Sequence, residues 1–324
     1  MEVAKGSVGK LLQCLPQETI KYAFAYGSGA FKQTGDTTTD KMVDFIVATN
    51  DPVKFHLENI KQNPKHYSSV RFLGAHIVSQ LQQKYAARVY YNTRVRHRER
   101  LIKYGVVTID DLQHDLLDWK WLFLAGRLHK PVLNIVEPAR NIAYAIQENY
   151  KSALQAALLL LPESFNISQF LYQIVALSYN GDFRMLFGED KNKIKKIAEG
   201  SAEELQAIYM PLLESDSRIL VRGSLIEQDL SSAAVYHRLQ LLPSAVLEKI
   251  QKTYHQRDAK QRDIEEVTFS LANHIDAPQQ VAAALESIVS SAAWSQTLKN
   301  IVTAGFARSV VYSYAKLKKM FRSY

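Results

Sequence analysis

The stretch that decides the fold is Ile20-Lys-Tyr-Ala-Phe-Ala-Tyr26, then Gly27-Ser28-Gly29, a polar loop, and Met42-Val-Asp-Phe-Ile-Val-Ala48. The first segment is rich in aromatic residues and ends at the glycines. The second is apolar except for Asp44, and Asn50-Asp51-Pro52 closes it as a turn. Both segments have the length and composition of buried strands. The sequence therefore predicts a sheet whose first turn contains glycine and whose second strand carries one acid.

The glycine turn and the acid together indicate a phosphate site. Glycines let the backbone approach a phosphate closely, and the Ser28 hydroxyl and nearby N–H groups can bond its oxygens. Burying an unpaired carboxylate is costly, so Asp44 should have a cation, a hydrogen-bonded partner or an open cleft. An acid placed there could hold Mg²⁺ against the phosphate. The structural alternative is a simple turn beside a buried ion pair.

Outward from this stretch the pattern predicts further strands and then helices. Strands are expected over residues 88–92, 101–107 and 131–136, the first two of them paired. Helices are expected from residue 52 and over residues 74–85, 110–124, 141–161, 168–178, 201–213 and 243–253. A strand-bearing N-terminal half followed by a helical C-terminal half predicts the α+β class, a catalytic domain with a helical appendage.

Composition narrows the class of protein. The chain has 324 residues, 47% of them hydrophobic, which suits a globular protein of about two domains. Cys14 is the only cysteine, so neither an internal disulfide nor a cysteine-based zinc site is expected. His56 and His66 lack a third ligand at metal-site spacing. No apolar stretch approaches the ~20 residues of a spanning helix, so a soluble or membrane-peripheral protein is expected.

The positive charge is concentrated at the C-terminus. The net charge is +8, yet residues 1–286 carry 34 basic and 32 acidic side chains, so residues 287–324 supply six of the eight charges. This uneven distribution is not that of a general nucleic-acid binder. Apolar residues recur there at helical spacing, which predicts a basic amphipathic helix, at Phe306, Val310, Tyr314, Leu317 and Phe321. Such a helix could dock on the core, or contact an anionic membrane surface at ~1 kcal/mol per basic residue.

The glycine turn before an acid-bearing strand resembles the nucleotidyltransferase superfamily that includes DNA polymerase beta. In that superfamily the strand carries two carboxylates, at positions i and i+2, which bind the metals. Here Ile46 occupies the second position, on the same face as Asp44. Another carboxylate, Asp40 or a distant one, must replace it, or the site uses fewer protein ligands.

A series of short blocks makes a closer resemblance, from about Tyr22 to the C-terminus. Together they resemble the mitochondrial phosphatidate cytidylyltransferase family, also called the mitochondrial translocator assembly and maintenance proteins. The blocks include Tyr26-Gly-Ser-Gly29, Val43-Asp-Phe45, Asp51-Pro-Val53, His66-Tyr-Ser68, Val89-Tyr-Tyr-Asn92, Leu101-Ile-Lys-Tyr-Gly-Val106, Ala125-Gly-Arg-Leu-His-Lys-Pro131, Leu177-Ser-Tyr-Asn-Gly-Asp-Phe-Arg-Met185 and Arg262-Asp-Ile-Glu-Glu266.

The resemblance implies a reaction and a place in the cell. CTP and phosphatidate would give CDP-diacylglycerol and pyrophosphate with Mg²⁺, peripherally on the matrix side of the mitochondrial inner membrane, and the product would feed cardiolipin synthesis. It also implies a nucleotidyltransferase-like mixed-sheet domain over residues 1–140 and a mainly helical domain over 141–294. Residues 295–324 would form the basic amphipathic segment that meets the anionic membrane.

The resemblance also implies roles for the residues of the glycine turn and for two acids. Gly27, Ser28 and Gly29 would cradle the triphosphate, and Ser28 would belong to the catalytic set. Asp44 would be a metal ligand, and Asp182 could supply the missing carboxylate. The alternative for Asp182 is a salt bridge at a helix terminus.

Cations and polar side chains complete the predicted site. Lys103 would neutralise triphosphate charge, or else extend to solvent. Lys130 would touch phosphate, or simply be exposed. Arg184 would clamp a phosphate. Tyr91 and Asn92 would contact the nucleotide, although a strand tyrosine is more often a packing residue.

Two other functions compete with this interpretation. One is a nucleotidyltransferase with another acceptor, which should lack a lipid-docking tail and show stacking aromatics in basic grooves. The other is a non-enzymatic assembly factor for inner-membrane translocases, which would tolerate the loss of Ser28 and Asp44.

Overall fold

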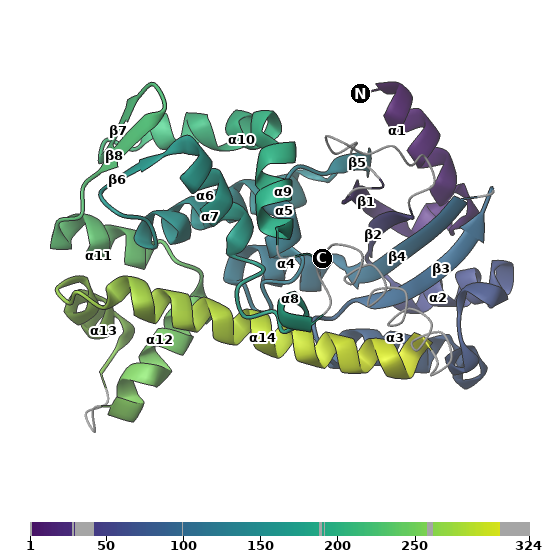
Figure 1. Cartoon of the computed structure of the whole chain (residues 1–324). Coiled ribbons are helices and arrows are strands. Elements are labelled where there is room, and N and C mark those ends of the chain that lie inside the picture. The colour runs from purple at the N-terminus through teal and green to yellow at the C-terminus, as the bar shows by residue number, and fades with distance from the viewer. Residues whose placement is uncertain are drawn as a thin grey trace.

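A mixed five-stranded sheet lies beside a mainly helical half in the computed structural model, which describes residues 2–27, 29, 42–98, 100–187, 190, 192–257 and 262–304 (Figure 1). The strand order is β3-β4-β2-β1-β5. The strands are β1 (Ile20–Tyr26), β2 (Val43–Thr49), β3 (Tyr90–His97), β4 (Arg100–Thr108) and β5 (Leu133–Val136). Strands β2 and β4 run parallel, whereas the other neighbours are antiparallel. The α+β class and the strand-first order of the chain are confirmed.

The alternation of side chains divides the sheet into two differently covered faces. Tyr22, Ile46 and Tyr91 point into the main core, which the sheet shares with the helical half. Phe45 and Tyr104 point into a second core, closed by α1 (Glu2–Gly9) and the 3₁₀ helix η1 (Lys10–Cys14). The main-core face therefore lies toward the helical half, and Asp44 belongs to this face by strand alternation.

The second face also holds a buried polar network rather than a metal site. Both ring nitrogens of His56 form hydrogen bonds. Nδ1 lies 2.8 Å from the Tyr67 hydroxyl, and Nε2 lies 2.8 Å from the side-chain oxygen of Gln82. Asn59 donates to the hydroxyls of Tyr67 and Tyr104, at 3.0 and 2.8 Å. Burial lowers the pKa of His56 to about 4, so the ring is neutral at physiological pH. These bonds fix α2 (Pro52–Gln62) and α3 (Gly74–Lys84) against the sheet.

The helical half contains the helices predicted over residues 141–161, 168–178, 201–213 and 243–253, and also others that were not predicted. Its elements are α4 (Ile109–Asp118), α5 (Ala125–Leu128), α6 (Arg140–Leu159), α7 (Ile167–Ala176), α8 (Arg184–Phe187), α9 (Lys193–Gly200), α10 (Ala202–Ser215), α11 (Ser232–Gln240), α12 (Ser244–Arg257), α13 (Ile264–Ala272) and α14 (Ala277–Ala304). Helices α8, α9, α11, α13 and α14 were not predicted. A small sheet of β6 (Ser164–Asn166), β8 (Leu225–Gln228) and β7 (Ile219–Arg222) was not predicted. Its strands have only three or four residues, too few for a period-2 signal.

Helix α4 is shorter than predicted because a buried acid turns the chain. The predicted helix ran to residue 124, whereas α4 ends at Asp118 and Trp119 adopts a left-handed conformation with φ 54°. Asp115 then accepts hydrogen bonds from the backbone N–H groups of Trp121, Phe123, Leu124 and Ala125, at 2.9, 3.0, 2.6 and 3.1 Å. The carboxylate thus holds an irregular loop that leads directly into α5.

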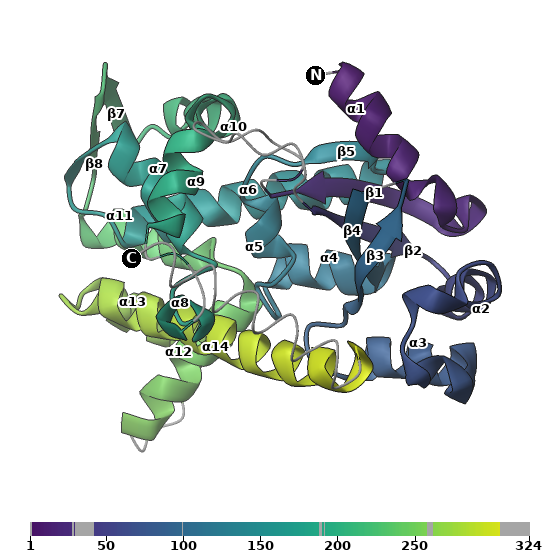
Figure 2. The ribbon, with the colours of Figure 1, turned by 45° about the vertical axis from the view of Figure 1, so that its right-hand side comes forward.

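Helix α14, with 28 residues, runs along both halves of the molecule (Figures 1 and 2). Its first part packs on α12 and α6, and its last part packs on β3. There Gln296 donates to the Val89 carbonyl at 3.0 Å, and Lys299 donates to the Tyr85 carbonyl at 2.8 Å. The helix is continuous across residues 294–295, where a domain boundary is predicted; that division stays a prediction. No helix among the described residues combines the length and apolarity needed to cross a membrane.

The predicted amphipathic helix of residues 306–321 lies outside the described residues, as do Ser28 and Asp40.

Candidate active site

Asp44 and Lys103 stand side by side on the main-core face of the sheet. Parallel pairing of β2 with β4 places them directly opposite each other. The Lys103 ammonium lies 3.5 Å from the nearer carboxylate oxygen of Asp44 and 4.5 Å from the centroid of the Tyr91 ring. That oxygen is buried and accepts no hydrogen bond among the described residues. Asp44 therefore has the cationic partner that burial requires and keeps an acceptor for a further ligand.

The glycine turn lies against the same carboxylate. Gly27 has a φ of 74°, and a Cβ built there would lie 3.8 Å from the second carboxylate oxygen of Asp44. A Cβ on Gly29 would overlap the Met42 carbonyl oxygen, so only glycine fits. The structure thus brings Gly27 to Asp44 and Gly29 to the backbone of Met42 and Val43, whereas the role of Ser28 stays a prediction.

Only one of the two predicted nucleotide-contacting residues reaches this face. Tyr91 points toward Asp44 and packs against Phe123, with ring centroids 6.3 Å apart. Asn92 points to the opposite face, paired in register with Tyr104, and is 3% exposed. Neighbours in a strand face opposite ways, so treating the two as a pair was the error.

Arg127 is the residue that the sequence analysis missed. Its guanidinium lies 4.3 Å from the centroid of the Tyr26 ring and 5.5 Å from that of Phe123. Tyr26 pairs in register with Asp44, so Arg127 lies over the strand next to the acid. No carboxylate among the described residues forms an ion pair with it. Its place in the block Ala125-Gly-Arg-Leu-His-Lys-Pro131, three residues before Lys130, was the available signal.

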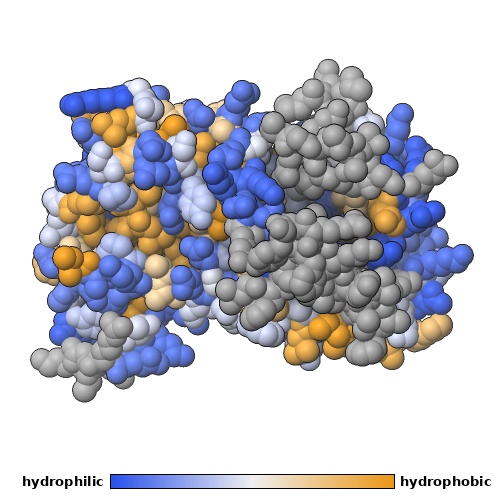
Figure 3. Space-filling model, in the orientation of Figure 1, coloured by the Kyte–Doolittle hydropathy of each residue, from blue (hydrophilic) through white to orange (hydrophobic). Residues whose placement is uncertain are grey.

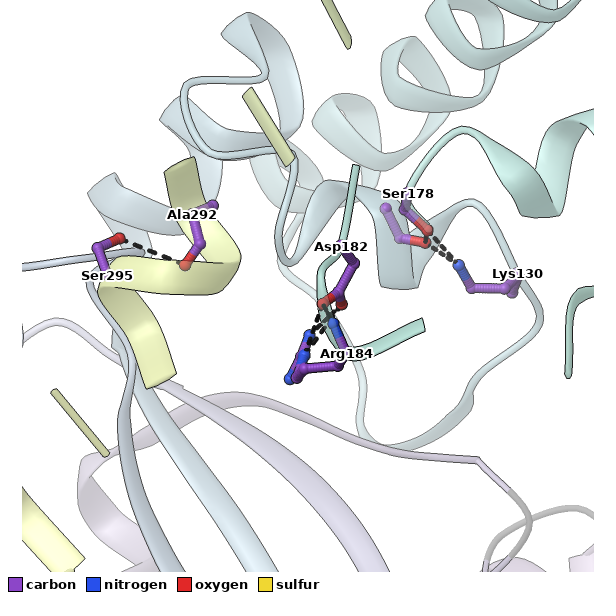
Figure 4. Close-up of polar contacts among 7 residues, drawn as sticks. Lys130, Ser178, Asp182, Arg184, Ala292 and Ser295 are labelled. Atoms are coloured by element: carbon purple, nitrogen blue, oxygen red, sulfur yellow. Dashed lines mark hydrogen bonds and ion pairs between the residues drawn. The ribbon is translucent and has the colours of Figure 1, made fainter. Parts of the chain in front are cut away.

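Lys130 is a further basic residue of this region, and it lies farther from the sheet than Arg127. Its ammonium donates to the Ser178 hydroxyl at 2.9 Å and to the Gly126 carbonyl (Figure 4). The Tyr179 ring lies between the ammonium groups of Lys130 and Lys193, each 5.1 Å from its centroid. Burial, with the charges of Arg127 and Lys193, holds the pKa of Lys130 well below its usual value. A bound anion would relieve this repulsion.

Asp182 and Arg184 are engaged with each other (Figure 4). The Arg184 Nε–H donates to both carboxylate oxygens of Asp182, at 2.8 and 3.0 Å, and the Arg184 backbone N–H donates to one of them at 3.0 Å. This is the geometry of the helix-terminal salt bridge considered as the alternative. A metal role for Asp182 would require this ion pair to open, so that assignment stays a prediction without geometric support.

A small cavity lies beside Asp182 and Arg184, and neither Asp44 nor Lys103 lines it. Arg127, Lys130 and Arg184 line one side of it, with Ser178, Tyr179 and Asp182. Helix α14 forms the other side with uncharged residues, Val289, Ala292 and Ala293. Trp121, Leu122 and Phe123, from the loop that Asp115 holds, complete the lining. The cavity therefore combines a cationic wall with an apolar wall.

The donor set at Asp44 suits a magnesium ion held largely by its substrate. No group of three or more His, Cys, Asp or Glu side chains converges in the described part of the chain. Mg²⁺ commonly takes one or two carboxylates and fills its remaining positions with phosphate oxygens and waters. Asp44, whose side chain is 25% exposed beside the glycine turn, can be such a carboxylate.

Known proteins resemble this chain over nearly its whole length. The family model described as mitochondrial phosphatidate cytidylyltransferase matches residues 8–319. The protein of that name from Caenorhabditis briggsae is 50% identical, and the match covers 97% of this chain and 98% of that protein. The one from Danio rerio is 40% identical, and the match covers 97% of this chain and 94% of that protein. The human protein of that name is 38% identical over 91% of this chain and 66% of its own length.

A crystal structure of a nucleotidyltransferase-like protein from Exiguobacterium sibiricum matches with a TM-score of 0.26 and 11% identity, over 90% of this chain and 76% of that one.

Proposed function

The chain belongs to the mitochondrial phosphatidate cytidylyltransferase family, and from this premise we propose that it makes CDP-diacylglycerol from CTP and phosphatidate. The observation that carries the proposal is the carboxylate of Asp44 beside the glycine turn, together with two cations, Arg127 and Lys130, that form no ion pair with a carboxylate among the described residues. A protein that only supports assembly of other proteins would have no use for this arrangement.

The proposed reaction is an in-line displacement at phosphorus. An oxygen of the phosphatidate phosphate attacks the α-phosphorus of CTP. The bond from that phosphorus to the oxygen that links it to the β-phosphorus breaks, and pyrophosphate leaves with that oxygen. The attacking phosphate monoester is largely ionised near neutral pH, so no strong base is needed. Catalysis then depends on positioning and on cations near the departing charge. Gly27 and Gly29 would hold the triphosphate, and Lys103 would neutralise part of its charge.

Magnesium is the proposed cofactor. When bound, it would offset the charge that develops on the leaving pyrophosphate. Asp44 would hold it, and Lys103, 3.5 Å away, would keep the carboxylate oriented. Arg184 would reach phosphate only through the guanidinium atoms that Asp182 leaves unused.

The direct test supplies purified protein with CTP, Mg²⁺ and phosphatidate in mixed micelles. We expect CDP-diacylglycerol and pyrophosphate in equal amounts, with CTP preferred over the other nucleoside triphosphates. Phosphatidate is then replaced by an RNA primer or by glycerol 3-phosphate, to identify a different acceptor. Absence of lipid product over a range of detergents and vesicles would contradict the proposal and favour the assembly-factor alternative.

The proposed location is the matrix side of the mitochondrial inner membrane, where the product would feed cardiolipin synthesis. Contact with the anionic surface would come from the basic segment that starts at residue 295. Because Gln296 and Lys299 anchor α14 to the sheet half, a deletion that spares the fold has to begin after them.

Deleting residues 305–324 is therefore expected to abolish binding to vesicles that contain cardiolipin, while CTP binding stays intact. Five of the six basic residues beyond Glu286 lie in the deleted segment, so electrostatic attraction to the anionic surface is lost with them. Flotation with vesicles and calorimetry with CTP provide the two measurements. Phosphatidylcholine vesicles are the control for charge. Undiminished flotation of the shortened protein would remove the tail from membrane binding.

A further inference from the structure

We propose that the folded body of the protein docks on an anionic membrane through one face, formed by the 3₁₀ helix η4 (Ser69–Leu73) and the last turns of α14. Phe72 and Leu73 would enter the lipid. This inference rests on the proposed location at a membrane, and it gives the folded body a contact of its own beside the contact made by residues 305–324. It does not depend on the reaction.

The face carries large exposed apolar side chains on both of its parts. Phe72 and Leu73 are 78% and 62% exposed, and Leu298 and Val302, one helical turn apart on α14, are 65% and 61% exposed. Single exposed apolar residues are normal on a protein surface, whereas a cluster of them marks a surface that meets a partner or a membrane. An apolar patch lies over this part of α14 in the space-filling view (Figure 3).

Hydrogen bonds hold the two parts of the face together. The hydroxyl of Ser68, the residue before η4, donates to the Thr303 carbonyl near the end of α14 at 2.6 Å. Helix α3 follows η4 directly, and the Lys299 ammonium of α14 donates to the Tyr85 carbonyl just after α3, at 2.8 Å. Figures 1 and 2 both show α3 beside the last part of α14. The apolar side chains of η4 and of α14 therefore belong to one surface, although they lie far apart in the sequence.

Only basic charges accompany these apolar side chains. Between Glu58 and Glu99 the chain has no acidic residue and eight basic ones, Lys61, Lys65, Arg71, Lys84, Arg88, Arg94, Arg96 and Arg98. Beyond Glu286 it has no acidic residue either, so both segments that build the face are purely basic. The Arg71 guanidinium lies 4.8 Å from the centroid of the Phe72 ring. An anionic lipid surface complements this combination, because its headgroups meet the cations while its acyl chains accept the apolar side chains.

The C-terminal segment leaves the described part of the chain at this same face. Helix α14 ends at Ala304, and residues 305–324 carry five further basic residues and no acid. Apolar insertion and electrostatic attraction would therefore act at one place, and stable attachment to a membrane needs two such signals together. A second copy of the chain is a poorer partner, because two such faces would bring like charges together.

A double variant, Phe72→Ser with Leu73→Ser, tests the apolar insertion. Flotation with vesicles that contain cardiolipin should show about tenfold weaker binding, because two apolar side chains no longer leave water on docking. Phe269→Ser, at a 62% exposed position of α13 in the helical half, is the matched control and should bind as the wild-type protein does. Thermal unfolding of both proteins shows whether they fold.

A second double variant, Leu298→Ser with Val302→Ser, changes the other part of the face and remains informative if the first does not fold. It should weaken flotation by a similar factor. Undiminished flotation of the folded variants would overturn the inference. If flotation is undiminished and sedimentation shows that the variants have lost a dimer that the wild-type protein forms, the face is instead an interface between two copies.

Activity on two forms of phosphatidate separates this inference from the proposed function. On phosphatidate embedded in vesicles, both double variants should form CDP-diacylglycerol about tenfold more slowly than the wild-type protein at limiting vesicle concentration. On dioctanoyl phosphatidate dissolved in water, they should be as fast as the wild type. If no protein forms CDP-diacylglycerol but flotation of the variants still falls, the proposed function fails and the docking face stands. If all proteins form it at equal rates on vesicles and float equally, the docking face falls and the function stands.

Discussion

An Asp44→Asn variant is expected to keep its fold and to lose about 10²–10³-fold in kcat for CDP-diacylglycerol formation. Asparagine has nearly the same shape, so packing at this partly exposed position is preserved. It cannot supply the negative charge that offsets Lys103 and that would hold Mg²⁺ beside the triphosphate. The loss should therefore be larger at low Mg²⁺ and should be only partly recovered when Mg²⁺ is raised.

Initial rates over a range of Mg²⁺ concentrations measure this effect. Asp110→Asn, at an exposed acid in the first turn of α4, is the matched control and should leave the rate unchanged. Calorimetry with CTP, in the presence and absence of Mg²⁺, separates metal binding from nucleotide binding. A kcat within a few fold of the wild-type value would remove Asp44 from the reaction and leave the glycine turn as the remaining support for the site.

An Asp115→Asn variant is expected to lower the free energy of unfolding by about 3 kcal/mol. Four backbone N–H groups converge on this 2%-exposed carboxylate, and an amide would turn an NH₂ group toward donors that need an acceptor. The loop it holds carries Trp121 and Phe123 to the cavity and starts the helix that bears Arg127. Activity should therefore fall even at temperatures where the variant is folded.

Urea denaturation of the two proteins gives the difference in stability. Asp118, three residues further on, accepts one hydrogen bond among the described residues, from the Ser244 hydroxyl at 3.2 Å. Asp118→Asn should therefore cost less than about 1 kcal/mol. Equal losses for the two substitutions would mean that the four hydrogen bonds contribute little beyond an ordinary surface contact.

Local features of the chain were predictable from sequence, whereas pairings between distant segments were not. The β1–turn–β2 unit and the single acid of β2 follow from a short apolar pattern that needs no knowledge of the rest of the fold. That Lys103 would neighbour Asp44 depends on parallel pairing of β2 with β4, across a crossover of 50 residues that no local period encodes. The sequence analysis selected Lys103 for its chemistry, and only the sheet register explains its position.

Three residues show what the local sequence pattern leaves out, since each depends on a facing direction, an ion pair or a contact with an aromatic ring. Asn92 was grouped with Tyr91 although strand alternation separates neighbours. Asp182 was offered as a metal ligand, yet Arg184, two residues away, occupies both its oxygens. Arg127 was missed because its role arises from stacking on Tyr26, a residue a hundred positions earlier in the chain.

The docking of α14 has a consequence for the order in which this protein folds. The bond from Gln296 to Val89 joins residues 207 positions apart, and the bond from Ser68 to Thr303 joins residues 235 positions apart. Contacts that close such long loops form late, because the entropy of the intervening chain opposes them until the rest is ordered. During synthesis the β3 end of the sheet therefore stays uncovered until α14 has emerged. A chain interrupted before residue 277 would lack the helix that closes the cavity, so a prematurely ended chain should be both prone to aggregate and inactive.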